Sequence, residues 1–460
     1  MEVNLNLNLN IDKNKEFYKT IAAITIPIAL QNIISYSVNL MDTVMLGRLG
    51  EVALSATSLA NQIFFMFTLL IFGIGGGAVV LCSQYWGVKN IVNIQKITTI
   101  VLKIAFWVSL VFALVLLIFP REVMTVFTSD KEVIKAGTSY LRVLSISYLF
   151  YGLTSTFLVI LRSVETVNIC LKIYILSFVV NVIFNYIFIF GKLGVNPLGV
   201  TGAAVGTLIA RMMEFLVIII YMLKYETKII YRPHMLKFKD KTLLKEMLKY
   251  GMPVICNELL WGIGISIHAV ILGHLSSSVV AANSICNVIY QMSTSFILGV
   301  ANASSVVMGK TIGSGDKDEA INIKNKLLFI YLILGITTAS VLLLIKSPVI
   351  SLYNMEEYNI EDTTKTLANN LMYIYAFHIL FQAFTSPIIA GILRGGGDTK
   401  FAAVIDVIFL WLLLPLGFVA AFKFNINPIL VLLLLRFETP IKSVFCLWRL
   451  RNDKWINILT

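Results

Sequence analysis

The sequence carries little charge for its length. Of its 460 residues, 13% are charged and 58% are hydrophobic, and the mean hydropathy is +0.85. A soluble domain has about 25% charged residues, so the polar surface that a water-facing globule needs is missing. We therefore expect a polytopic membrane protein that leaves no room for a soluble catalytic domain.

Metal and redox motifs are also missing. The five cysteines all lie within apolar runs, and no two of them have the Cys-x-x-Cys spacing of a redox or metal site. The four histidines are scattered along the chain. A membrane enzyme would need close polar residues such as paired carboxylates or a His-rich motif. We expect a protein that is not an enzyme and has no cofactor.

Apolar runs long enough for a membrane crossing of about 20 residues make up most of the chain. There are twelve, and the predicted fold class is an all-α integral membrane protein with twelve transmembrane helices. The first twenty residues are too polar for the apolar part of a cleaved signal peptide. We expect a disordered or interfacial tail there, although its alternating Asn and Leu residues would also suit a strand or an amphipathic segment. The runs cover approximately residues 21–46, 53–82, 97–119, 137–160, 173–191, 200–223, 250–273, 278–308, 327–347, 367–393, 401–422 and 428–448.

The net charge of +12 is explained by membrane topology. With a cytoplasmic N-terminus, about 26 of the 37 Lys and Arg residues fall on cytoplasmic segments and about 8 outside, as the positive-inside rule requires. The remaining three, Arg142, Arg211 and Arg436, lie within predicted helices. Both termini should be cytoplasmic, and we expect a multi-pass protein of the plasma membrane with no nucleic-acid partner.

A basic segment divides the chain near its middle. We interpret it as a cytoplasmic linker with an interfacial helix near Lys241 to Lys249, and the alternative is a lipid-binding switch. The predicted domains are a cytoplasmic tail (1–20), an N-terminal six-helix lobe (21–223), the basic linker (224–249), a C-terminal six-helix lobe (250–448) and a cytoplasmic C-terminal tail (449–460).

The two halves of the chain repeat each other. An offset of 226 positions places Pro253 on Pro27 and His268 on Asp42, and 15 of the 61 positions from Pro27 to Gly87 are identical. Six helices per half is an even number, so both halves have the same orientation in the membrane, as in transporters built from parallel repeats. This symmetry predicts two six-helix bundles that rock against each other to give alternating access.

Helix breakers occur where such a movement needs flexible helices. Pro27 and Pro253 lie early in the first helix of each half, and a proline removes a backbone hydrogen bond and kinks a helix. We predict that both act as hinges. Glycines 73 and 75–77 are expected to interrupt the second helix. Ordinary tolerance of Gly and Pro in membrane helices is the alternative explanation.

Ionisable residues within the apolar runs mark ion or substrate pathways, because a charge at the centre of a membrane helix costs about 2.5 to 3.5 kcal/mol. Four residues qualify, namely Asp42, Glu258, His268 and Asp406. Asn181 and Asn185 are four residues apart and share a helix face with oxygen atoms that suit a hard cation. Thr207 lies on the next helix.

Structural explanations exist for each of these residues. Asp42 could cap a helix at the membrane interface, His268 could donate between helices, and the amides could bond to neighbouring helices. We interpret two further pairs as structural charge pairs towards the cytoplasmic helix ends. They are Arg211 with Glu214 and Arg436 with Glu438.

Five short motifs along the chain are distinctive. They are residues 27–31 and 41–47 in the first helix, 161–163 after the fourth, 199–204 in the sixth and 393–400 after the tenth. Together they resemble the multidrug and toxic compound extrusion (MATE) family, and the resemblance covers nearly the whole chain. It implies twelve helices in two lobes and the export of cationic amphiphilic compounds in exchange for Na⁺ or H⁺.

The resemblance also implies which residues bind the coupling ion. The family's N-terminal cation site corresponds to Asp42, with polar partners at Asn181, Asn185 and Thr207, and Na⁺ is one possible occupant. Some members have an aspartate where this chain has Asn185, so the site here has one carboxylate fewer. A C-terminal cation site of the norfloxacin-exporter type is doubtful, because Glu258 is displaced by about one turn and the tenth helix offers Gln382 without a carboxylate.

The expected mechanism is competition between the ion at Asp42 and a cationic drug. Aromatic and apolar side chains favour organic cations. The expected partners are organic cation drugs or dyes and the lipid bilayer, and the expected oligomeric state is a monomer. A flippase for a lipid-linked or other amphiphilic substrate is the alternative, although it would need a cluster of basic residues in its cavity. The predicted substrate cavity consists of Gln31, Tyr36, Phe65, Met66, Glu258, Trp261, His268 and Tyr290.

Overall fold

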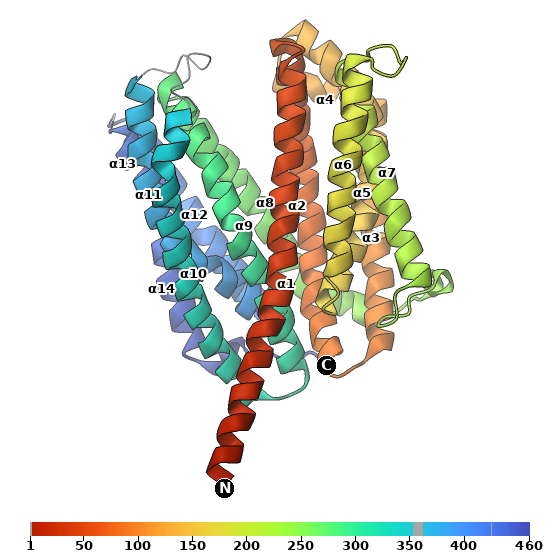
Figure 1. Ribbon diagram of the computed structural model, residues 1–460, viewed down its shortest axis with the longest axis vertical. Helices are drawn as coiled ribbons and strands as arrows, with labels where there is room; N and C mark the ends of the chain where they lie inside the picture. The colour runs from red at the N-terminus through yellow and green to blue at the C-terminus, as the bar shows by residue number, and fades with distance from the viewer. Residues whose placement is uncertain (1, 353–361, 425) are drawn as a thin grey trace. The chain divides into compact units, whose positions relative to one another are not determined.

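The computed structural model describes residues 2–352, 362–424 and 426–460, and within these ranges helices account for nearly the whole chain and no β-strand occurs (Figure 1). The first half contains α1 (Glu2–Gly47), α2 (Glu51–Gly87), α3 (Ile91–Ile118), α4 (Pro120–Phe127), α5 (Lys131–Ser163), α6 (Asn168–Phe190), α7 (Val200–Lys224) and the short 3₁₀ helix η1 (Pro233–Lys237). The second half contains α8 (Lys241–Gly273), α9 (Ser277–Gly313), α10 (Lys317–Leu352), α11 (Asp362–Ser386), the π-helical segment η2 (Pro387–Leu393), α12 (Thr399–Phe422), α13 (Pro428–Arg436), α14 (Glu438–Leu450) and the 3₁₀ helix η3 (Asp453–Trp455).

Eleven helices of the described residues are long and apolar enough to cross a membrane. They account for eleven of the twelve predicted runs, and the twelfth run is divided at Phe437 into α13 and α14. Pro440 explains the break, because it has no N–H to bond to the carbonyl of Arg436 and its ring crowds that carbonyl. The prediction of an all-helical integral membrane protein is confirmed.

Three local details differ from the expected ones. The first residues, expected to be a disordered or interfacial tail, are helical, and α1 is continuous from Glu2. Residues Lys241 to Lys249 are helical as expected, but they form the first turns of the long helix α8 and not a separate helix. The glycines of the second run do not interrupt α2, which is continuous from Glu51 to Gly87.

The chain packs as two compact units. The N-terminal unit consists of residues Leu30–Leu259, and the C-terminal unit combines Met1–Ala29 with Leu260–Thr460. Both units therefore contain a piece of α1 and a piece of α8. The predicted lobes share most of their residues with these units and differ from them at these two helices.

Each unit has the same internal packing order. In the N-terminal unit α2, α3 and α5 pack on one another, and α7 packs on α5 and α6. In the C-terminal unit α9, α10 and α11 pack on one another, α14 packs on α11 and α12, and α13 contacts α11 and α12. The helices correspond in order, as expected if the two halves are repeats.

Glycines explain how the crossing pieces of α1 and α8 pack. In the N-terminal unit, a Cβ atom added at Gly73 of α2 would lie 2.6 Å from the Cα atom of Ile255 in α8. In the C-terminal unit, a Cβ atom added at Gly299 of α9 would lie 2.8 Å from the carbonyl oxygen of Thr25 in α1. Gly299 is the repeat counterpart of Gly73, so both units use the same close backbone approach.

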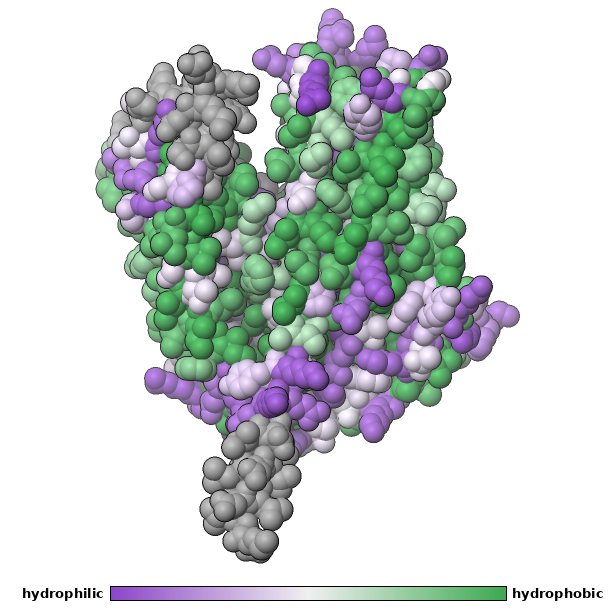
Figure 2. Space-filling model, viewed as in Figure 1, coloured by the Kyte–Doolittle hydropathy of each residue, from purple (hydrophilic) through white to green (hydrophobic). Residues whose placement is uncertain are grey.

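Apolar residues cover the long sides of the helices, and hydrophilic residues gather mainly at the helix ends (Figure 2). Large apolar side chains such as Trp107, Leu344 and Val444 are more than half exposed to the surroundings of the protein. A soluble protein would not present so many. This surface is that of a protein surrounded by lipid.

Candidate functional site

Asp42 of α1 lies at the end of a chain of polar side chains from three helices of the N-terminal unit. The Asn185 Nδ2 atom of α6 donates to Asp42 Oδ1 at 2.6 Å and to Asn181 Oδ1 at 3.1 Å. The Asn181 Nδ2 atom then donates to the Thr207 hydroxyl of α7 at 3.3 Å. Asn181 and Asn185 are buried. All four residues of the predicted cation site are thus connected by hydrogen bonds.

The Asn185 side-chain oxygen is buried and has no hydrogen-bond partner within the described residues. It rests on Gly206 of α7, where an added Cβ atom would overlap it. A buried acceptor without a partner costs about 1 to 3 kcal/mol, and buried polar atoms normally have partners. Rotation of the amide by half a turn would place this oxygen beside the oxygens of Asp42 and Asn181. Three oxygens in that position would require a cation between them.

Arg211 adds a half-buried positive charge to the same unit. Its Nη1 atom lies 2.7 Å from Glu214 Oε1, and its guanidinium lies 5.0 Å from the centre of the Tyr151 ring and 5.9 Å from that of Phe64. Arg211 is close enough to act electrostatically on Asp42. The three groups Asp42, Glu214 and Arg211 together carry one net negative charge when ionised, which suits one monovalent cation.

The residues predicted to line the substrate cavity fall in both units. Gln31, Tyr36, Phe65, Met66 and Glu258 belong to the N-terminal unit, and Trp261, His268 and Tyr290 belong to the C-terminal unit. Gln31 is buried and accepts a hydrogen bond from Arg162 Nη2 at 3.3 Å, whereas Phe65 is exposed. A shared substrate cavity of these residues stays a prediction.

A cavity of about 370 Å³ lies elsewhere in the N-terminal unit. Side chains of α3, α5 and α7 line this cavity together with residues of the segment that follows α7. Trp107 of α3, Phe157 of α5 and Tyr231 of the segment after α7 are among them. None of the predicted substrate residues is among the residues that line it.

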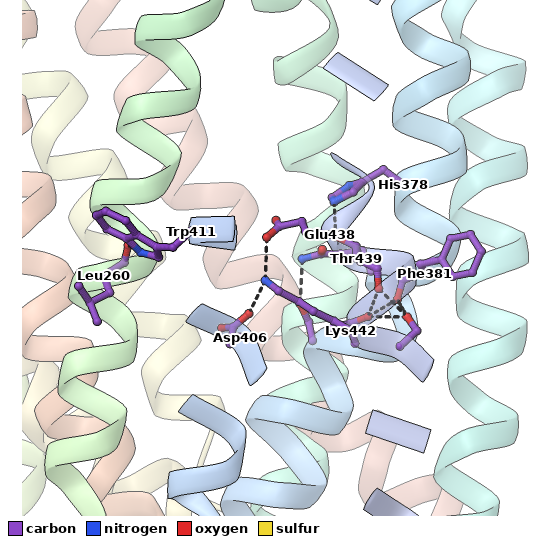
Figure 3. A network of polar contacts seen from close by, with 12 residues as sticks. Leu260, His378, Phe381, Asp406, Trp411, Glu438, Thr439 and Lys442 are labelled. Atoms are coloured by element: carbon purple, nitrogen blue, oxygen red, sulfur yellow. Dashed lines mark hydrogen bonds and ion pairs between the residues drawn. The ribbon is translucent and has the colours of Figure 1, made fainter. Parts of the chain in front are cut away.

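The C-terminal unit contains a second buried charge cluster (Figure 3). The Lys442 Nζ atom of α14 lies 3.0 Å from Asp406 Oδ1 of α12 and 3.0 Å from Glu438 Oε2, one turn earlier in α14. The side chains of Lys442 and Glu438 are only 3% and 5% exposed. Beside them, His378 Nε2 of α11 lies 2.9 Å from the Thr439 hydroxyl, which extends the polar network into a third helix.

The repeat counterpart of Asp42, His268, is buried, and its Nε2 atom has no hydrogen-bond partner in the described part of the chain. The alternative that His268 donates a hydrogen bond to another helix stays a prediction that would need its Nδ1 atom. On α11, Gln382 donates to Ser386, and Thr385 bonds to Ser443 of α14 at 2.7 Å.

Clusters of the usual metal-binding side chains do not occur in the described part of the chain. Within residues 2–352, 362–424 and 426–460, no three His, Cys, Asp or Glu side chains come close enough together to hold a metal ion. The Asp42 cluster combines one carboxylate with amide and hydroxyl oxygens. Oxygen donors of these types suit a hard cation.

Comparison with models of known protein families identifies the family of this chain. The family model MatE matches the chain twice, at residues 27–187 and at residues 253–419. The starts of these two matches differ by the 226 positions of the internal repeat. The chain belongs to the MatE family. Members of this family are membrane transporters, so the predictions of the family and of a transporter that is not an enzyme are confirmed.

Individual MatE proteins resemble the chain along most of its length. The probable multidrug resistance protein YoeA of Bacillus subtilis is 25% identical over 87% of this chain and 86% of its own. The probable multidrug resistance protein NorM of Thermotoga maritima is 22% identical over 90% and 87%. The solved structure of an outward-facing multidrug resistance MATE family transporter has a TM-score of 0.83 at 19% identity, covering 94% of this chain and 95% of that one.

Two features of this MatE chain were missed by sequence reasoning. Lys442 was counted among the basic residues at helix ends, but it is buried beside two carboxylates. Its position four residues after Glu438 was the available signal, because residues four apart meet on a helix. Arg211 was interpreted as part of a structural pair, but it also acts on Asp42.

Proposed function

We propose that this MatE transporter is a secondary active antiporter that exports cationic amphiphilic compounds in exchange for Na⁺ or H⁺ bound at Asp42. The observation that carries the proposal is the half-buried Asp42 carboxylate beside the Asn185 side-chain oxygen, which has no hydrogen-bond partner among the described residues. The drug-resistance names of the relatives support an organic cation as the exported substrate.

The Asn185 amide gives the site two states. Without an ion, the amide nitrogen donates to Asp42 and stabilises its charge. With Na⁺ bound, the amide oxygen turns towards the ion and joins Asp42, Asn181 and Thr207 as ligands. With H⁺ bound, the carboxyl group becomes a donor, and the same amide oxygen accepts its hydrogen bond. Either ion therefore reverses the hydrogen bond between two residues of different helices.

Charge competition couples the ion to the drug. The cluster of Asp42, Glu214 and Arg211 has one net negative charge, which either the coupling ion or a cationic drug can neutralise. An ion that enters from outside displaces the drug. Each positive charge that moves inward gains about 2.3 kcal/mol per 100 mV of membrane potential, so the ion gradient can drive export against a drug gradient.

Helix α1 links the ion site to the movement of the chain. It carries both Pro27 and Asp42, and the two compact units divide it directly after Pro27, at Ala29. A change in the hydrogen bonding of Asp42 therefore acts on a helix that is weakened at its proline. In α8, Pro253 occupies the equivalent place six residues before the division at Leu259. We propose both prolines as hinges of alternating access.

The proposed transporter works as a monomer in the plasma membrane with both termini in the cytoplasm. The distribution of Lys and Arg supports this orientation. A flippase for an amphiphilic lipid-linked anion is less consistent with the charges, because the cations Arg211 and Lys442 are each paired with a carboxylate. Such pairs leave little positive charge for a pyrophosphate group.

Ethidium efflux from cells tests the proposal. The wild type is compared with Asp42→Asn, and the Na⁺ and H⁺ gradients are collapsed separately. We expect the substitution to abolish efflux and the loss of one gradient to do the same, which names the ion. Asp240→Asn, which removes a carboxylate outside the membrane helices, is the matched control. Efflux that needs neither Asp42 nor a gradient contradicts the antiporter.

A further inference from the structure

Each compact unit packs a half-buried arginine against two aromatic rings. In the N-terminal unit, Arg211 of α7 faces Phe64 and Tyr151. In the C-terminal unit, the Arg436 guanidinium of α13 lies 5.5 Å from the centre of the Tyr290 ring and 5.3 Å from that of Tyr375. Tyr290 is the repeat counterpart of Phe64. The two arginines thus occupy similar places in the two repeats, each beside aromatic rings.

The carboxylates near these arginines also correspond in number. The N-terminal unit has Asp42 and Glu214, and the C-terminal unit has Asp406 and Glu438. One arginine and two carboxylates give each of these two clusters one net negative charge. The cluster of the C-terminal unit has one further charged group, the ammonium of Lys442, which brings the net charge of that cluster to zero when His268 and His378 are neutral.

Lys442 takes the position that a bound cation would have. Its Nζ atom lies 3.0 Å from both carboxylates, and its side chain is 3% exposed (Figure 3). Asp406 comes from α12, whereas Glu438 and Lys442 come from α14, so the ammonium joins two helices. The Asp406 side chain is 19% exposed and is the part of the cluster nearest to the surroundings of the unit.

We propose that Asp406 and Glu438 form a second cation site whose occupant is the chain's own Lys442 ammonium. This inference rests on the proposed function, because it assigns ion exchange to Asp42 alone. A free monovalent cation has to compete with an ammonium that is tethered to the same helix as Glu438 and has a high effective concentration at the site. The C-terminal unit therefore keeps its cation through the transport cycle, and one ion is exchanged per cycle.

Removal of the tethered ammonium should open the site to a free cation. The test uses purified full-length protein with the N-terminal site disabled by Asp42→Asn. Two proteins are compared, namely Asp42→Asn alone and the double variant that combines Asp42→Asn with Lys442→Gln. Thermal unfolding of each protein is measured in NaCl and in choline chloride. We expect Na⁺ at about ten times its dissociation constant to raise the Tm of the double variant by about 2 °C. We also expect the double variant to bind about one ²²Na⁺ per chain and Asp42→Asn alone to bind none.

Two matched variants control for the loss of lysine itself. In the Asp42→Asn background, Lys442→Arg keeps a tethered charge, so we expect no Na⁺ binding. Asp406→Asn combined with Lys442→Gln removes one negative charge with the positive charge, and we again expect none. Both controls preserve the size of the side chains closely.

A second measurement serves if Lys442→Gln does not fold. Lys442→Ala leaves space for a small free ammonium, so methylammonium chloride added during purification should restore the folded protein and raise its Tm, and choline chloride should do neither. The proposal is overturned if the Lys442→Gln protein folds and binds no ²²Na⁺, or if neither Na⁺ nor methylammonium stabilises Lys442→Ala.

The two proposals fail in different ways. If Asp42 is not the coupling site, the Asp42→Asn substitution leaves gradient-driven efflux unchanged, while the binding measurements on the C-terminal unit still stand. If Lys442 is not a tethered cation, efflux depends on Asp42 as proposed, but substitution of Lys442 gives no Na⁺ site.

Discussion

Asn185 donates a 2.6 Å hydrogen bond from its amide nitrogen to the Asp42 carboxylate, while its own side-chain oxygen has no partner. Hydrogen bonds to charged groups contribute about 1.5 to 3 kcal/mol. The amide therefore stabilises the ionised carboxylate in one orientation and offers an oxygen ligand in the other. The predicted site depends on this residue as much as on the aspartate.

Replacement of Asn185 by Ala tests that dependence. The substitution removes both the donor to Asp42 and the oxygen ligand, so we expect the affinity for the coupling ion to fall by about tenfold or more. The measurement is the concentration of the coupling ion that half-saturates ethidium efflux. Asn322→Ala, which removes an exposed amide bonded to Glu319, should leave this concentration unchanged. An unchanged value in Asn185→Ala would exclude the amide from the site.

Gly206 offers a test that changes no charge and no ligand. A Cβ atom at this position would overlap the Asn185 side-chain oxygen and lie 2.9 Å from its backbone nitrogen. Overpacking of this kind costs about 1 to 3 kcal/mol, and the side chain of Asn185 must move. We expect Gly206→Ala to weaken ion-driven efflux about as much as Asn185→Ala. Gly273→Ala is the control, because a Cβ atom there meets nothing within 4 Å.

The close packing of α2 on α8 predicts a loss of stability. A Cβ atom added at Gly73 would lie 2.6 Å from the Cα atom of Ile255, and backbone cannot give way as a side chain can. We expect Gly73→Ala to lower the free energy of unfolding by about 1 to 3 kcal/mol and the Tm by at least about 2 °C. Thermal unfolding in detergent checks this, again with Gly273→Ala alongside. If Gly73→Ala and Gly273→Ala have the same Tm, α2 and α8 can move apart at Gly73 without loss of stability, and the prediction is wrong.

The lowered pKa of the Asp240 carboxyl group predicts that the stability of the protein depends on pH. The backbone N–H of Leu243, the ammonium of Lys96 at 3.0 Å and the N–H of Thr242 hold the pKa of its carboxyl group below the usual value. The carboxylate therefore contributes stability at pH values above about 4, its pKa in the unfolded chain. This contribution disappears as the pH falls through the lower pKa of the folded protein.

The comparison of wild type with Asp240→Asn checks this sign. Asparagine is also a good residue at the start of a helix, so the variant keeps the cap of α8 and loses only the charge. We expect the wild type to have the higher Tm at pH 7 and the difference to shrink in the most acidic buffer that leaves the protein folded. A difference that grows on acidification would contradict the assignment.

The contact among the four residues of the Asp42 site was predictable from the sequence and its family resemblance, because a carboxylate and two amides within apolar runs are conspicuous; the hydrogen bonds among them agree with that grouping, and ion binding there stays a prediction. The direction of the hydrogen bonds was not predictable, because it depends on how α1 and α6 are rotated. For the same reason, the open oxygen of Asn185 became visible only in the structure.

The second charge cluster was harder to predict, because Asp406 and Lys442 are far apart in sequence and meet only through the packing of α12 on α14. The break at Phe437 was also not predicted, although Arg436, Glu438 and Lys442 lower the hydropathy around it and Pro440 follows it closely.

The division of α1 at Ala29 has a consequence for synthesis of the protein. The ribosome makes residues 1–29 first, yet these residues pack with a unit whose other members begin at Leu260. Gly299, against which Thr25 packs, emerges only after the whole N-terminal unit. The start of α1 must therefore stay in the membrane without its final partners during most of translation, and slow or interrupted translation of the second half should leave it open to proteolysis or to incorrect association.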